Sequence, residues 1–365
     1  MIHTTTTITT ITTMSTKISQ FEETISKDHP IYKPEKGRYW LYLSAGCPFA
    51  QRVWITRALK NLTGVVGVTV VHWKLAGEGN QWKLVKGDKA DLGDAPYTID
   101  GGIKSSSYNT STLLGELSDD NEVPFVDGTV DPNYGITHLK ELYDMIPDIE
   151  YTGTYEFPVL WDLKTKTIVN NNWDQLPGIL NSAFSELEEN SGTIDLVPQQ
   201  LAKDIHEFNE WMSTHINFAV YEVGLAKEQA VYEKNLVQFY KDLDTVEQKL
   251  QTVYTDIQKK YGSEQEILKH FFLFNEQITE SDIRLYTTIV RFDPVYAVHF
   301  KLNWRTIRSD YKFIHLWLRN LYWNHKEFGS TTNFNHIKLL YFRSQLEVNP
   351  NGLVLYGPEK NILEL

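Results

Sequence analysis

The sequence contains one cysteine, Cys47, among 365 residues. This excludes an internal disulfide and a Cys-rich metal site, and it is typical of proteins from a reducing compartment. Positive charge is also scarce, because 35 Lys and Arg stand against 47 Asp and Glu, which leaves a net charge of −12 at pH 7. The sequence has no basic stripe, whereas binding to nucleic acid requires clustered cations. We therefore expect no nucleic-acid partner.

Long apolar runs are missing as well, since no window approaches the roughly 20 apolar residues that span a bilayer. Residues 1–16 are rich in threonine and lack the features of a secretory signal and the arginines of a mitochondrial presequence. We expect residues 1–20 to be a disordered tail, and the protein to be cytoplasmic without a membrane partner. The histidines show no metal-ligand spacing, so we expect no metal.

The stretch from Arg38 to Arg57 is the most informative part of the chain. Tyr39–Leu43 has strand composition, Ser44-Ala45-Gly46 is a small-residue turn, and Pro48 suits the first position of a helix. Cys47 is thus expected where a helix begins, and free N–H groups and the helix dipole favour the thiolate there. A lone cysteine is more often an inert buried residue, but this context favours a reactive thiol. Any redox partner thiol then comes from another molecule.

This stretch resembles the fungal omega-like glutathione transferases and, within them, the glutathionyl-hydroquinone reductases of the Xi class. Their signature reads Arg-Tyr-x-Leu-Tyr-x-Ser-x-x-Cys-Pro-Trp-Ala-His-Arg. The chain matches it at Arg38, Tyr39, Leu41, Tyr42, Ser44, Cys47, Pro48, Ala50 and Arg52, and departs at Phe49 and Gln51. The resemblance implies a glutathione transferase fold, with an α/β thioredoxin-like N-terminal domain, an all-α C-terminal domain and assembly as a homodimer.

The patterns along the chain agree with this organisation. They predict strands at Val65–His72, Phe157–Asp162 and Thr165–Val169, with a short helix near Thr137–Met145 inside a long irregular segment, residues 74–156. Helices follow Leu196, and Thr279 and Asp282 form a predicted capping box. We expect a thioredoxin-like domain over residues 21–190, a helical domain over 191–330, and an extension over 331–365 that returns toward the active site.

The resemblance also implies a glutathione site at Phe49, Trp82, Phe157, Pro158, Asn172 and Trp173. Pro158 matches a cis-proline whose preceding residue pairs with the cysteinyl part of glutathione. Trp82 matches a glutathione-binding tryptophan, although a packing role fits its sequence context equally well. The family has Glu-Ser in place of Asn172-Trp173, where the pair binds the γ-glutamyl end. It also tends to have Arg in place of Thr154. A neutral group in place of the charged one predicts roughly tenfold weaker binding of glutathione.

The implied substrate residues are Tyr221, Tyr341, Arg291 and Tyr296. Tyr221 and Tyr341 match tyrosines that bind the hydroxyls of a hydroquinone. Arg291 has two open interpretations, a ligand contact or a structural ion pair with Asp293.

The resemblance therefore implies an enzyme that reduces glutathionyl-hydroquinones through a mixed disulfide between Cys47 and glutathione. Glutathione is the expected co-substrate, and an aromatic or quinone-derived molecule is the expected substrate. Two alternatives stay open: an omega-type dehydroascorbate reductase or deglutathionylase, and a diverged paralogue without catalytic activity.

Overall fold

The computed structural model describes residues 21–73, 75–76, 81–84, 128–146, 151, 154–187, 193–274 and 276–365. The predicted tail and much of the predicted irregular segment lie outside these residues. Two compact units make up the chain. The first extends to Thr193 and also contains Ser330–Gln345 and Gly352–Val354, and the second contains Ile194–Gly329, Leu346–Asn351 and Leu355–Leu365.

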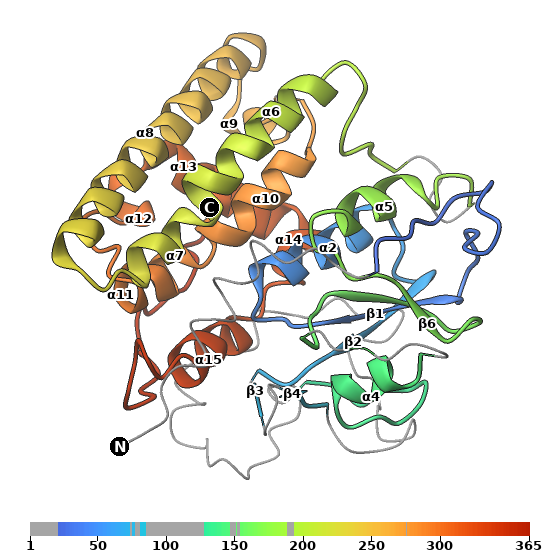
Figure 1. The fold of residues 1–365 in the computed structure, drawn as a ribbon. Helices are drawn as coiled ribbons and strands as arrows, with labels where there is room; N and C mark the ends of the chain where they lie inside the picture. Colours follow the sequence, from blue (N-terminus) through green and yellow to red (C-terminus); the bar gives the residue numbers. More distant parts are fainter. Residues whose placement is uncertain are drawn as a thin grey trace. The chain divides into compact units, whose positions relative to one another are not determined.

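The first unit is built on a four-stranded sheet with the order β2-β1-β5-β6 (Figure 1). Strand β1 (Tyr39–Leu43) pairs in parallel with β2 (Val66–Val70) and antiparallel with β5 (Val159–Asp162). Strand β5 also pairs antiparallel with β6 (Thr167–Asn170). Every residue of β1, β2 and β5 is buried, as in a sheet that is covered on both faces. The predicted strands and the α/β class of this part are confirmed.

Helices cover both faces of this sheet. Helix α2 (Pro48–Leu59) connects β1 to β2 and packs beside α5 (Leu176–Ser182). Helix α4 (Leu139–Asp144) lies on the opposite face, where Leu139, Leu142 and Tyr143 are buried (Figure 1). The predicted short helix in this region is confirmed. A small hairpin of β3 (Leu75–Ala76) and β4 (Gln81–Trp82) lies beside it, joined by a bridge between Lys83 and His138.

An N-terminal arm, residues 21–37, runs along the edge of the sheet. Glu22 forms a bridge with Asn170, the Glu23 N–H donates to the Val169 carbonyl, and the Asn171 N–H donates to the Phe21 carbonyl. The start of the arm therefore extends the sheet beyond β6.

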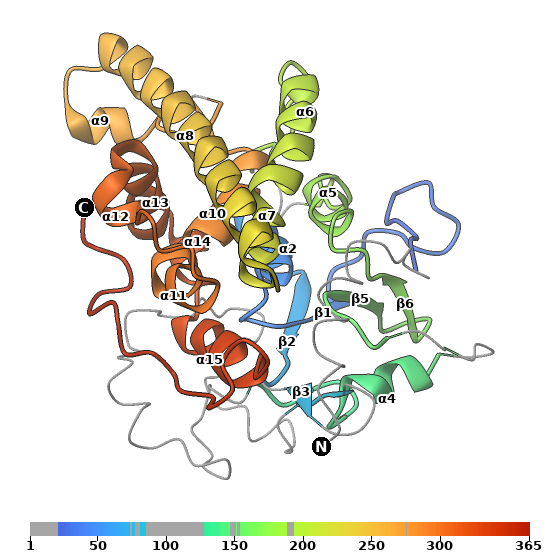
Figure 2. The same cartoon turned by 60° about the vertical axis from the view of Figure 1, so that its left-hand side comes forward.

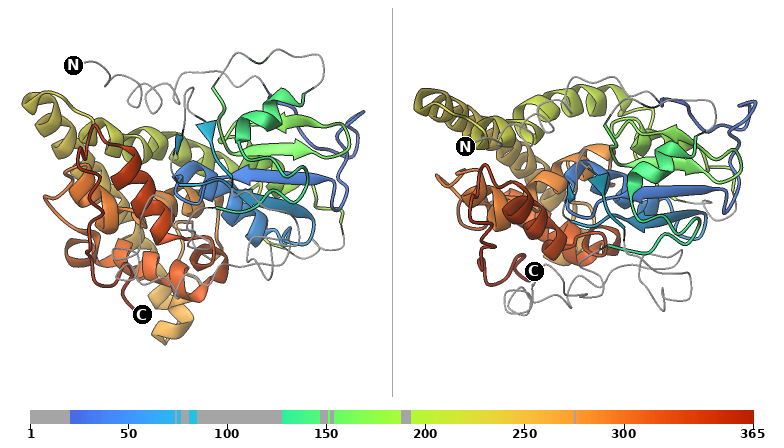
Figure 3. Two further views of the ribbon diagram at one scale, coloured as in Figure 1. Left: turned by 90° about the horizontal axis from the view of Figure 1, so that it is seen from below. Right: turned by 60° about the horizontal axis from the view of Figure 1, so that its bottom comes forward.

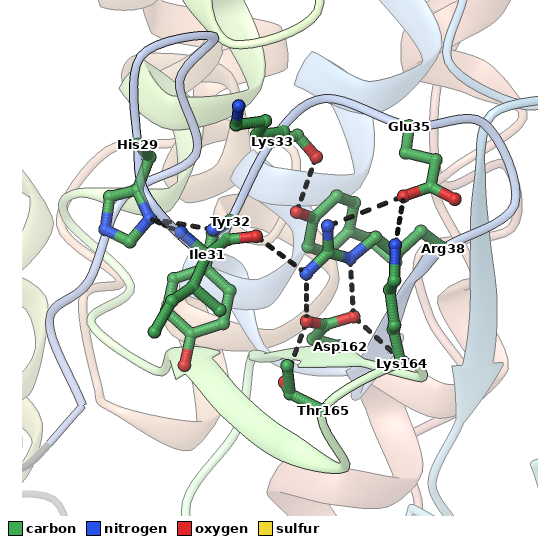
Figure 4. Close-up of polar contacts among 10 residues, drawn as sticks. His29, Ile31, Tyr32, Lys33, Glu35, Arg38, Asp162, Lys164 and Thr165 are labelled. Atoms are coloured by element: carbon green, nitrogen blue, oxygen red, sulfur yellow. Dashed lines mark hydrogen bonds and ion pairs between the residues drawn. The ribbon is translucent and has the colours of Figure 1, made fainter.

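Further along, the arm is held by a buried ion pair between Arg38 at the start of β1 and Asp162 at the end of β5 (Figure 4). The Arg38 Nε and Nη2 atoms lie 2.8 and 2.6 Å from the two carboxylate oxygens, and Nη2 also donates to the Ile31 carbonyl. Thr165 and the Lys164 N–H donate to the same carboxylate. One salt bridge thus joins two strands, a hairpin turn and the arm.

The second unit is helical, and its longest element is the 32-residue helix α8 (Gln229–Lys260) (Figure 2). Its buried side chains include Leu243, Val246, Leu250, Val253 and Ile257, the stripe that the sequence spacing predicts. The other segments are α6 (Ala202–Met212), η4 (Ser213–Asn217), α7 (Ala219–Gly224), α9 (Glu264–Leu268), α10 (Glu280–Ile289), η5 (Phe292–Tyr296), α11 (Ala297–His299), α12 (Ile307–Asp310), α13 (Lys312–Asn324) and α14 (Lys326–Gly329). Figure 3 shows these segments in colours from yellow-green to orange-red.

The predicted capping box is present at the start of α10. Thr279 donates from its N–H and its hydroxyl to the Asp282 carboxylate, and both side chains are fully buried. Trp317 and the Leu273 N–H donate to the other oxygen of Asp282. Burial raises the pKa of Asp282, and these four hydrogen bonds oppose that shift. The box closes the helix start around a fully desolvated carboxyl, which is a folding role.

Over the described residues, none of the helices combines the length and apolar character that a membrane crossing requires.

Candidate active site

Strand register places three of the sequence motifs at one end of the sheet. Tyr42 near the end of β1 pairs with Val159 at the start of β5, and Leu160 pairs with Asn170 at the end of β6. The segments that continue from these strand ends carry Cys47, Pro158 and Asn172. Cys47 therefore lies at the same end of the strands as Pro158 and Asn172, which come more than a hundred residues later in the sequence.

Cys47 is the N-cap residue of α2 and has an extended backbone, and Pro48 occupies the first turn. The cysteine is 7% exposed and its side chain makes no capping hydrogen bond. The Gly46 N–H donates to the Ser44 hydroxyl, which holds the preceding turn. The expected position of Cys47 at a helix start is confirmed.

The peptide bond between Phe157 and Pro158 is cis, as the resemblance implies. The Phe157 ring lies 4.6 Å from the Trp82 ring, centroid to centroid, with an angle of 66° between the two planes. Trp82 is half-buried. Its contact with Phe157 holds β4 against the loop that contains Pro158. Trp82 therefore has a packing role, and part of its side chain is still exposed.

The second aromatic contact joins Phe49 on α2 to Trp173 in the turn before α5. Their ring centroids are 4.5 Å apart. The buried Arg52 guanidinium lies 4.9 Å from the Phe49 ring centroid and 5.6 Å from the Trp173 ring centroid. Trp173 therefore packs onto the first turns of the helix that begins at Cys47, instead of presenting a small hydroxyl there.

Asn172 is fixed by hydrogen bonds on each side. Its N–H donates to Asn170 Oδ1, and its own Oδ1 accepts from the Asp174 N–H at 3.0 Å. Its Nδ2 donates to Glu22 Oε1 at 2.9 Å. Sequence reasoning compared Asn172 only with the family's glutamate and missed Glu22, because nothing in the local pattern pairs a residue of the arm with one that is 150 positions later.

Helix α15 (Phe334–Ser344) belongs to the first unit and packs against the turn before Cys47. A Cβ on Gly46 would lie 2.8 Å from Leu340 Cδ2 and 2.9 Å from the His336 carbonyl oxygen. The Gln51 amide, one of the departures from the signature, donates to the Thr331 carbonyl and the Thr332 hydroxyl just before α15. Tyr341 is 2% exposed within this helix.

Gly46→Ala is expected to lower kcat/KM about 10- to 100-fold, because displacing a reacting group by about 1 Å has effects of that size. The new methyl group meets the backbone of α15, which cannot rotate away, so the turn or the helix has to shift. Steady-state kinetics with a glutathionyl-hydroquinone, the substrate that the resemblance implies, measures the loss. Gly262→Ala is the control, since a Cβ there meets no heavy atom within 4 Å. Equal activity of the two variants would contradict the prediction.

The other predicted substrate residues lie in the second unit. The Tyr221 ring contacts Tyr296 at 6.3 Å and Phe300 at 5.3 Å, and Tyr296 stacks on Phe300 at 5.4 Å. Tyr221 is 9% and Tyr296 is 1% exposed. The structure thus brings these two tyrosines together in one aromatic cluster.

Arg291 is fully buried, and its Nη1 donates to the Thr287 carbonyl. The interpretation that Arg291 forms an ion pair with Asp293 is wrong, because within the described ranges the Asp293 carboxylate pairs with Arg308. The Asp293 carboxylate binds Arg308 Nε at 2.9 Å and accepts from the N–H groups of Ile307 and Arg308. Asp293 caps α12, and its ion-pair partner, Arg308, comes from that helix.

Within the described ranges, no group of three or more His, Cys, Asp or Glu side chains is arranged to hold a metal ion.

A thioredoxin-like sheet with a cysteine at the start of α2, a cis-proline just before the strand that pairs with β1, and a helical second unit define a glutathione transferase. The comparisons with known proteins agree. Residues 229–320 match the family "Glutathione S-transferase, C-terminal domain". The chain is 46% identical to glutathione S-transferase omega-like 2 of Saccharomyces cerevisiae over 96% of both chains. It is 33% identical to the glutathionyl-hydroquinone reductase YqjG of Escherichia coli, covering 90% of this chain and 82% of that protein.

Among solved structures, the chain is similar to the Xi glutathione transferase ECM4 of Saccharomyces cerevisiae in complex with glutathione. That comparison has a TM-score of 0.87 and 46% identity, and it covers 95% of this chain and 98% of the other. The chain belongs to the omega-like, Xi-class glutathione transferases.

Proposed function

We propose that the protein is a glutathione-dependent reductase of glutathionyl-hydroquinones. The observation that carries the proposal is the meeting of Cys47, the cis-proline loop and the Asn170–Trp173 segment at one edge of the sheet. The similarity to a glutathionyl-hydroquinone reductase and to a glutathione-bound Xi transferase supports the substrate class.

In the first step, the Cys47 thiolate attacks the glutathione sulfur of the conjugate. A disulfide bond forms between Cys47 and glutathione, and the carbon–sulfur bond of the conjugate breaks. The electron pair of that bond passes into the ring and is neutralised by a proton, which releases the hydroquinone. In the second step, the thiolate of another glutathione attacks the glutathione sulfur of the mixed disulfide. Oxidised glutathione leaves and the Cys47 thiolate is regenerated.

The family resemblance supports roles for individual side chains. We propose that Phe157 and Pro158 contact the cysteinyl part of glutathione, and that Phe49 and Trp82 form the apolar walls beside it. We also propose that Trp173 and Asn172 contact the γ-glutamyl end. Tyr341 contacts the aromatic substrate, as do Tyr221, Tyr296 and Arg291 on the strength of the family resemblance.

Intact mass spectrometry after incubation with oxidised glutathione tests this proposal. Wild type is expected to gain a single glutathionyl group that reduced glutathione removes, and Cys47→Ser is expected to gain none. Hydroquinone release from a conjugate is then measured directly. An unmodified wild-type protein whose thiol still reacts with a small alkylating agent would overturn the proposal and favour a paralogue without catalytic activity.

A second candidate is the omega-type activity, reduction of dehydroascorbate or of small mixed disulfides. The position of Cys47 at the start of α2 supports it, because a cysteine nucleophile serves both reactions. Parallel kcat/KM values for dehydroascorbate and a glutathionyl-hydroquinone separate the two activities.

Trp173→Ser is expected to lower the KM for glutathione about three- to tenfold, since it returns a hydroxyl to the γ-glutamyl end at the value of one hydrogen bond. The variant loses its contacts with Phe49 and Arg52, so its melting temperature is expected to fall. Trp304→Ser, at a 59% exposed position of the second unit, is the matched control. An unchanged or higher KM in Trp173→Ser would show that the indole itself takes part in binding.

We also propose that the protein works as a homodimer in the cytoplasm. The family resemblance supports the dimer, and the single cysteine supports a reducing compartment. Sedimentation equilibrium tests the first and fractionation of cells tests the second.

A further inference from the structure

The γ-glutamyl end of glutathione carries an ammonium group, and a carboxylate is its natural partner because such pairs combine charge with hydrogen bonding. Asn172 brings no charge to that end of the site. Its amide is also already oriented, since Oδ1 accepts from the Asp174 N–H and Nδ2 is thereby turned toward Glu22.

Glu22 holds its place through the backbone. It bridges Asn170, and its neighbours Phe21 and Glu23 make hydrogen bonds with Asn171 and Val169. This bridge lies at the end of β6, which register places at the same edge as Pro158 and the end of β1. Glu22 therefore lies at the same end of the strands as the turn before Cys47, on the far side of β6, although it precedes Cys47 in sequence.

The hydrogen bond with Asn172 does not neutralise the charge of Glu22. Its side chain is exposed, and its partner, the Asn172 amide, is neutral. Across the described ranges, the carboxylate has no Lys, Arg or His partner. A carboxylate that is oriented by an amide, exposed, and placed beside the turn before α5 is suited to receive a cation.

We propose that Glu22 binds the α-ammonium group of the γ-glutamyl residue, with Asn172 as the residue that positions it. This inference rests on the proposed function, because it specifies how the same site recognises glutathione. The altered motif then moves the carboxylate from the turn before α5 to the N-terminal arm, and recognition of the ammonium group is retained.

The test compares glutathione with glutaryl-cysteinyl-glycine, which lacks only the ammonium group. Calorimetric titrations use the Cys47→Ser background, in which no mixed disulfide forms. The Cys47→Ser protein is expected to bind glutathione about five times more tightly than the analogue, because an exposed ion pair contributes a difference of that size. Adding Glu22→Gln is expected to remove the preference by weakening glutathione alone. Glu23→Gln is the matched control, since that carboxylate faces His29.

A charge exchange sharpens the result. Glu22→Gln combined with Asn172→Glu returns the carboxylate to the turn and is expected to restore the preference, which a merely structural role of Glu22 would not do. This inference alone would be overturned if the preference for glutathione survived Glu22→Gln. It would also be overturned if the Cys47→Ser protein showed no preference while wild type still formed the Cys47 adduct. Absence of both the adduct and binding would overturn the proposed function together with it.

Discussion

Cys47→Ser is expected to lower kcat/KM for a glutathionyl-hydroquinone by a factor of about 10³ or more. The electrophile is a sulfur atom, and the attacking atom must itself leave as an anion in the second step. A serine oxygen is a poor nucleophile at neutral pH and a poor leaving group. The chain also contains no second cysteine that could take over.

The fold of this variant is expected to be unchanged. The Cys47 side chain makes no capping hydrogen bond, and serine is among the preferred N-cap residues. Circular dichroism and the melting temperature verify this, and Cys47→Ala controls for any residual reaction of the hydroxyl. Activity above about a tenth of wild type in a folded Cys47→Ala variant would place the chemistry elsewhere.

Asp162→Asn is expected to reduce the free energy of unfolding of the first unit by about 3–5 kcal/mol, the cost of leaving a buried charge without its partner. Arg38 and Asp162 have side chains that are 5% and 0% exposed, and their contact is bidentate. Removing the carboxylate charge leaves the Arg38 guanidinium buried without a charged partner at that position. It also weakens the hydrogen bonds from Thr165 and Lys164 that close the turn.

A double-mutant cycle with Arg38→Met measures the coupling. The double variant is expected to lose less stability than the sum of the single losses, because neither buried charge is then left alone. Urea unfolding followed by tryptophan fluorescence gives the midpoints. The exposed pair Lys27–Glu186, with side chains 64% exposed, is the control and is expected to show no measurable coupling. Additive losses at Arg38 and Asp162 would contradict the prediction.

The same pair has a pH signature. Burial opposes ionisation of Asp162, but hydrogen bonds from Arg38, Thr165 and Lys164 outweigh it and lower its pKa below the ordinary value of 3.8. A lowered pKa in the folded state means that the stabilisation is complete above the unfolded value. It is lost as the pH falls through the folded one. The difference in stability between wild type and Asp162→Asn is therefore expected to shrink below about pH 4.

Local features of the sequence were sufficient for much of the fold. The apolar run Tyr39–Leu43 predicts β1, and Pro48 marks the start of α2. The spacing of Leu243, Val246 and Leu250 predicts the buried face of α8. These signals are short-range, because helix and strand periodicity and capping depend on residues within a few positions of one another.

Contacts between segments that are far apart in the sequence could not be predicted from these short-range signals. Asp293 pairs with Arg308 instead of Arg291, and Gly46 is constrained by α15, nearly 300 residues later. Neither can be read from a pattern, because each depends on how whole elements pack.

The sequence by itself determined the strand–turn–Cys47–helix unit and its family, since those properties depend on residue types in a fixed local order. Only the tertiary structure decided which groups surround that unit: the Trp173 ring on Phe49, α15 against the turn, and Glu22 beside Asn172. The physical reason is that strand register at a sheet edge, and not proximity along the chain, determines which side chains meet.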